Sequence, residues 1–149
     1  MLAQALRDNG YATYRANLSA LLNIPATASE IEVCQTVQAG FPAKQLACMA
    51  STGQISPSDR DAIIPLRTLK ARLDKGQNLT TEESDKLFRL SHIRAMANAV
   101  FGNEEKAQRW LSKPKARFEG LTPINMIATA PGFRLVEEML LQVAEGYSF

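Results

Sequence analysis

Apolar residues in this chain recur at three- and four-residue spacing, and closely spaced helix start and stop signals divide them into short runs. No window alternates apolar and polar residues over a β-branched stretch, and no Asn-Gly or Asp-Gly pair joins two such windows. The pattern therefore predicts an all-α fold.

Start and stop residues give approximate helix boundaries. A first helix is predicted near 11–22, because Asn23-Ile24-Pro25 ends it. Thr27 and Glu30 have the spacing of a capping box, and Gly40 stops the helix that they begin. Further helices are predicted at about 42–52, at 57–63 with Ser56 as N-cap, at 65–75 before Gly76, at 81–101 after the capping box Thr80–Glu83, between Asn103 and Pro114, from Thr122 to Ile127, and after Gly132.

The middle of the chain, about 42–75, has the helix spacing of a helix-turn-helix. In its last helix, Leu66, Leu69 and Leu73 are expected to pack on the preceding helices, which leaves cations and a threonine outward. The net charge of +2 is concentrated in residues 54–76, which hold five basic and three acidic groups. Such cations suit guanine edges and phosphates, but any surface helix can carry them. The candidate DNA contacts are Ser58, Arg60, Arg67, Thr68, Lys70 and Arg72.

The composition is that of an ordinary water-soluble globular protein, with 149 residues, 46% hydrophobic and 21% charged. No apolar run approaches the roughly 18 residues needed to span a bilayer. Arg7 and Asp8 stand where a secretory signal peptide is apolar, so we expect a cytoplasmic protein that does not enter a membrane. In that compartment Cys34 and Cys48 are expected to be reduced thiols that pack as small hydrophobic residues.

Residues that bear chemistry do not form an enzymatic pattern. His92, the only histidine, lies in the long predicted helix without a second histidine or paired cysteines, so we expect a structural or solvent-edge role. The chain contains no Gly-x-Ser-x-Gly elbow and no glycine-rich phosphate loop. We therefore expect a protein that is not an enzyme and has no catalytic residue, metal or cofactor. The long helix has one predicted buried face, formed by Leu87, Leu90, Arg94, Ala97 and Phe101.

The segment from Asn103 to Phe149 is a punctuated series of short helices around the single tryptophan. Trp110 is expected to fill a core, since large aromatic side chains dominate packing. Gly120 and Gly132 are expected to adopt conformations that a Cβ atom would oppose. Core partners expected for Trp110 and Leu111 are Ile127, Phe133 and Val136.

This C-terminal segment resembles the toxin-binding domain of the Xre/MbcA/ParS-type antitoxins, the partners of RES-domain toxins. The resemblance rests on Trp110-Leu111, Pro114, Gly120-Leu121-Thr122-Pro123 and Gly132. The tract IIPLRTLKARLDKGQNLTTEESDKLFRL resembles the helix-turn-helix part of the same family, and the two blocks occur in the family's order. Lys70-Ala71-Arg72 replaces the consecutive arginines of many members, which implies weaker and less salt-sensitive DNA binding.

The resemblance implies an antitoxin that neutralises a RES toxin, whose class resembles ADP-ribosyltransferases and depletes NAD. It implies a helix-turn-helix region within residues 1–102 and a toxin-binding domain at 103–149, which covers the toxin's cleft with its last helix and tail. We expect repression of its own operon through operator DNA, and a homodimer, because helix-turn-helix proteins usually read two half-sites. The candidate toxin contacts are Arg134, Glu137, Glu138, Leu141, Glu145, Gly146, Tyr147, Ser148 and Phe149.

Two other functions fit the same pattern. One is a helix-turn-helix regulator whose C-terminal domain only dimerises, with no toxin partner. The other is a structural adaptor that binds neither DNA nor toxin. The aromatic residues of the tail, Tyr147 and Phe149, could also fold back onto their own domain.

Overall fold

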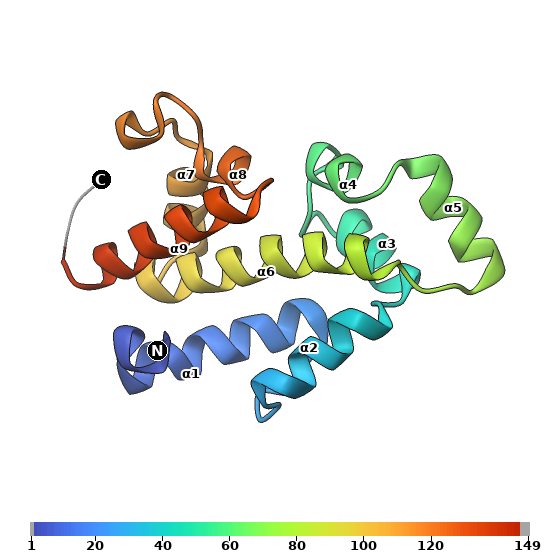
Figure 1. Ribbon diagram of the computed structural model, residues 1–149, viewed down its shortest axis with the longest axis horizontal. Helices are drawn as coiled ribbons and strands as arrows, with labels where there is room; N and C mark the ends of the chain where they lie inside the picture. The colour runs from blue at the N-terminus through green and yellow to red at the C-terminus, as the bar shows by residue number, and fades with distance from the viewer. Residues whose placement is uncertain (1, 147–149) are drawn as a thin grey trace. The chain divides into compact units, whose positions relative to one another are not determined.

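The computed structural model describes residues 2–146, and among the first eight side chains it describes that of Leu6 alone. Within that range the chain is helical, with one isolated bridge between Pro42 and Asn78 (Figure 1), which confirms the all-α prediction. The chain forms two compact units. We call residues 27–88 the middle unit, and residues 1–26 together with 89–149 the terminal unit.

The middle unit is built from short helices whose ends are defined by local capping. Ser56 Oγ accepts a hydrogen bond from the Asp59 backbone N at 3.0 Å, and Gly76 ends the fourth of these helices with φ of +63°. Thr80 and Glu83 form the predicted reciprocal pair, with bonds of 2.8 and 3.2 Å. The unit contains α2 (Glu30–Ala39), α3 (Ala43–Ser51), α4 (Pro57–Ile63), α5 (Leu66–Lys75) and the start of α6 (Thr81–Phe101).

The start of α2 differs from the prediction, because Ser29 and not Thr27 is its N-cap. Ser29 and Glu32 have the same three-residue spacing as Thr27 and Glu30, and they make both bonds of a capping box. The packing predicted for the cysteines is also wrong. Both are free thiols, but they lie on the exposed faces of their helices.

The two ends of the α3–α5 segment are joined by backbone hydrogen bonds. The Leu79 backbone N donates to Phe41 O at 2.8 Å, and the Phe41 N donates to Ser84 Oγ at 2.9 Å. Gly40 has φ of +90°, and a Cβ there would lie 2.2 Å from Leu79 O. The backbones can approach this closely only because residue 40 has no side chain.

The terminal unit packs helices from both ends of the sequence. α1 begins at Leu2, earlier than the predicted start near residue 11, with Gly10 inside the helix. Asn103 and Thr122 are N-caps, as predicted, and accept bonds from backbone amides three residues on. The elements are α1 (Leu2–Leu22), the remainder of α6, α7 (Glu104–Ser112), the 3-10 turn η1 (Ala116–Phe118), α8 (Pro123–Met126) and α9 (Ala130–Ala144).

The core of this unit contains Trp110 and Leu111, as predicted, while Phe133 is only partly buried. Gly120 has the expected positive φ of +90°, but Gly132 does not. Gly132 lies in the first turn of α9, where a Cβ would come within 1.9 Å of Met126 O. Its role is therefore a close contact between α8 and α9, not an unusual backbone conformation.

This contact predicts opposite effects of alanine at two helical glycines. Gly132→Ala should destabilise the protein by about 1–3 kcal/mol, because the backbone of Met126 must move. Gly10→Ala should stabilise it by about 0.5–1 kcal/mol, because its Cβ would meet only Leu6 Cβ at 3.4 Å. Urea unfolding of both variants checks the signs, and an unchanged stability of Gly132→Ala would contradict the tight contact.

Candidate functional site

The helices predicted for a helix-turn-helix are α3, α4 and α5, and α3 contacts both of the others (Figure 1). On α5, Arg67 and Lys70 are exposed and Thr68 is partly exposed. Ser58, at the start of α4, is exposed as well. These residues form an outward surface of one cationic helix and the first turn of the helix before it.

Fewer leucines of α5 are buried than their spacing predicted. Leu69 is buried, but Leu66 and Leu73 are 46% and 37% exposed. Only the middle of this ten-residue helix reaches the core, so both ends of its leucine stripe stay in solvent. The expectation that all three leucines pack on preceding helices is therefore wrong.

Arg60 does not belong to the outward surface. Its side chain is 8% exposed, and its guanidinium donates to Ile64 O at 3.0 Å and pairs with the Asp61 carboxylate at 2.6 Å. These two contacts, both made by Nη1, hold the guanidinium at the end of α4. Arg60 is thus a structural residue, and we omit it from the candidate DNA contacts.

Arg72 is held by the start of α6. Its guanidinium forms an ion pair with Glu83, whose carboxylate also accepts the backbone N–H of Thr80. Both side chains are largely buried, so this pair is less screened than a surface pair. Arg67 and Lys70 are therefore the predicted contacts most available to an external anion.

The helix α9 and the two residues after it carry the described part of the predicted toxin contacts. Arg134, Glu138, Glu145 and Gly146 are exposed, and Leu141 is partly exposed. Glu137 is partly exposed and bonds to His92 Nε2 at 2.7 Å. Tyr147, Ser148 and Phe149 lie outside the described residues.

Two exposed leucines in the same region were missed by the sequence reasoning. Leu135 on α9 is 44% exposed, and Leu121, before α8, is 49% exposed. Leu135 lies about 100° around the helix from the buried Val136 and about 40° from the buried Met139, so it stands at the outer edge of the buried stripe. The exposure of Leu135 could have been predicted from this position, because an apolar residue at the outer edge of the buried stripe of an amphipathic helix faces solvent in part.

Trp110 is covered by a buried cation. Lys115 Nζ lies 4.6 Å from the centre of the Trp110 ring, in cation–π geometry. Burial lowers the pKa of the Lys115 ammonium, and the positive charge of Lys113 lowers it further. The pair closes one side of the core beneath α7.

Residues 96–146 match the family model of the antitoxin Xre/MbcA/ParS C-terminal toxin-binding domain. The chain is also 58% identical over 147 residues to a curated antitoxin Xre of Pseudomonas putida, an alignment that covers 99% of this chain and 92% of that relative. The chain belongs to the Xre family of antitoxins. A toxin is therefore the partner of this antitoxin.

The matched segment begins inside α6 and ends at Gly146, so it lies within the terminal unit. It includes Leu121, Leu135 and all the described candidate toxin contacts on α9. None of the described helices is long and apolar enough to cross a membrane. Among the described residues, no group of three or more His, Cys, Asp or Glu could hold a metal ion.

The lowered pKa of Lys115 predicts a pH dependence of stability. Its folded-state pKa lies below the ordinary value of 10.5, so between these two values the unfolded chain binds more protons than the folded one. The free energy of unfolding of the wild type, relative to Lys115→Met, should rise as pH approaches 10.5 from below. Urea titrations of both proteins across this window measure the difference, and a constant difference would contradict the shift.

Proposed function

We propose that this antitoxin neutralises a RES-type toxin that degrades NAD, by covering the toxin's active-site cleft with α9 and the residues after it. The observation that carries the proposal is the exposed Leu135 beside the charged Arg134 and Glu138 on α9, inside the matched segment 96–146. An apolar side chain bordered by polar ones is the usual composition of an interface anchor and its rim.

The charges on α9 also support its placement over the toxin's cleft. A cleft that binds a dinucleotide must attract its phosphates, so we expect positive potential at its entrance. Glu138 and Glu145 are exposed on α9 and at its C-terminal end. Their carboxylates would complement such a cleft and block access of the dinucleotide. The antitoxin itself would catalyse no reaction.

Replacing Leu135 with Asp tests the α9 surface. Loss of an apolar anchor removes about 1.5–3 kcal/mol, so the affinity for the cognate toxin should fall about ten- to a hundredfold. Isothermal titration with the purified toxin measures this. Ile31→Asp is the matched control, because Ile31 is 70% exposed but lies in the middle unit, and it should bind as the wild type does.

Equal affinity of Leu135→Asp and the wild type would remove α9 from the proposed interface. A variant that ends at Gly146 separates the tail from the helix. If cells expressing the toxin keep their NAD with this variant, covering of the cleft does not need Tyr147 or Phe149.

We also propose that the antitoxin represses its own operon as a homodimer that places α5 in the major groove of operator DNA. The exposed Arg67 and Lys70 support this, since both project from the second helix of the α4–α5 pair. Arg72 joins them only if Glu83 gives up its ion pair, so we assign it a secondary role.

Arg67→Ala combined with Lys70→Ala tests this surface. In the proposed homodimer the double variant loses four phosphate contacts, two from each subunit, which should lower operator affinity about tenfold or more and reduce the slope of log affinity against log salt by about 4. Gel shifts at several salt concentrations measure both quantities. Lys106→Ala, an exposed cation on α7, is the control and should leave both unchanged; an unchanged slope in the double variant would exclude α5 as the contact.

A further inference from the structure

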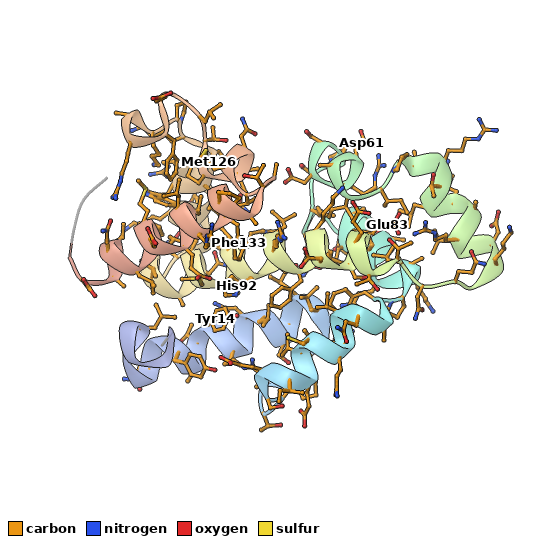
Figure 2. All side chains as sticks on the ribbon, viewed as in Figure 1. Tyr14, Asp61, Glu83, His92, Met126 and Phe133 are labelled. Carbon is orange, nitrogen blue, oxygen red and sulfur yellow. The ribbon has the colours of Figure 1, made fainter. Side chains whose placement is uncertain are left out.

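A buried chain of hydrogen bonds joins α1, α6 and α9. The Tyr14 hydroxyl lies 2.6 Å from His92 Nδ1 (Figure 2), and His92 Nε2 lies 2.7 Å from Glu137 Oε2. Tyr14 and His92 are almost completely buried, and Glu137 closes the chain at the partly exposed side of α9. All three residues belong to the terminal unit.

The order of these hydrogen bonds determines which group donates and which accepts. A carboxylate can only accept, so the proton on His92 Nε2 points to Glu137. With a neutral imidazole, Nδ1 is then an acceptor, and the Tyr14 hydroxyl donates to it. A rotation of the imidazole would leave polar groups without partners in a buried place, which is costly.

His92 contacts α9 at two points one turn apart. Besides Glu137, its ring packs against the ring of Phe133 at a centroid distance of 5.5 Å (Figure 2). The guanidinium of Arg89 lies 5.8 Å from the centre of the Phe133 ring. Residues four apart lie on the same side of a helix, so these contacts define both the rotation and the axial position of α9. Leu135 and Glu138 then face another direction, toward the proposed partner.

The helix α1 supplies the other end of this arrangement. It packs against α9, and Asn17 Nδ2 donates to the Ala95 carbonyl on α6 at 3.4 Å. Tyr14 and His92 both precede residue 96, where the match to the toxin-binding domain begins. Two of the three hydrogen-bonded residues, Tyr14 and His92, thus lie outside the segment that matches the toxin-binding domain.

We propose that α1 is a working part of the toxin-binding unit, and that His92, held between Tyr14 and Glu137, is the residue that positions α9 for the toxin. The inference rests on the proposed use of α9 as the toxin contact. It assigns a role to the N-terminal helix, and it makes Tyr14 and His92 positioning residues that need not touch the toxin.

Tyr14→Phe in the full-length antitoxin tests the proposal with a loss of one hydroxyl. Its affinity for the cognate toxin should fall about three- to tenfold, because α9 no longer has a single fixed position. Thermal melting must show the variant fully folded at the assay temperature, so that unfolding does not explain the loss. Tyr11→Phe is the matched control, since Tyr11 lies on the same helix and packs against Tyr14, and it should bind as the wild type does.

Substitution of His92 separates positioning from core filling. His92→Gln retains an amide that can donate to Glu137, whereas His92→Leu fills space without a donor. We expect Gln to retain most of the toxin affinity and Leu to lose it. Equal affinities of His92→Leu, Tyr14→Phe and the wild type would overturn the inference.

Two variants distinguish a failure of the proposed toxin contact from a failure of the positioning role. If Leu135→Asp weakens toxin binding while Tyr14→Phe does not, α9 is the contact and the positioning role is wrong. Amide hydrogen exchange without toxin gives an independent measurement. Exchange in residues 133–140 should be faster in Tyr14→Phe than in Tyr11→Phe, and identical protection would also overturn the inference.

Discussion

Burial of the middle of α6 on every side is the constraint on which the rest of the structure depends. From Leu90 to Ala97 each side chain of this helix is buried, including the polar Ser91, His92 and Arg94. A helix surrounded in this way cannot leave a polar group to water. Ser91 Oγ is buried without a hydrogen-bond partner, whereas the larger polar ring of His92 requires partners from other elements. The partners of His92 from α1 and α9 follow from this requirement, and they bring the two ends of the chain into one unit.

Local capping explains why most helix boundaries could be predicted. Ser56, Asn103 and Thr122 each bond to an amide three residues on, so the signal lies within one turn of the chain. The start of α2 shows the limit of such signals. Thr27 and Ser29 both begin a sequence of capping-box spacing, and only the fold decides which of them is used.

The candidate sites could be predicted less well, because burial depends on residues far apart in the sequence. The cationic pattern of residues 54–76 does not distinguish the exposed Arg67 from Arg60, whose guanidinium turns back onto its own helix end. The single apolar face expected for α6 gave no sign that His92 would meet Tyr14, 78 residues away. The side chains exposed on α9 were partly foreseen, since helical periodicity alone separates them from the buried Val136.

The pairing of Phe41 with Leu79 has a consequence for how this family can diversify. It brings together the two ends of a segment that contains α3, α4 and α5, so the backbone enters and leaves that segment at one place. A segment with adjoining ends can be exchanged as a block, because the flanking helices need only the same two attachment points. If α5 reads operator DNA as proposed, exchange of this block would change the operator preference and leave the sequences of α1, α6 and α9 as they are.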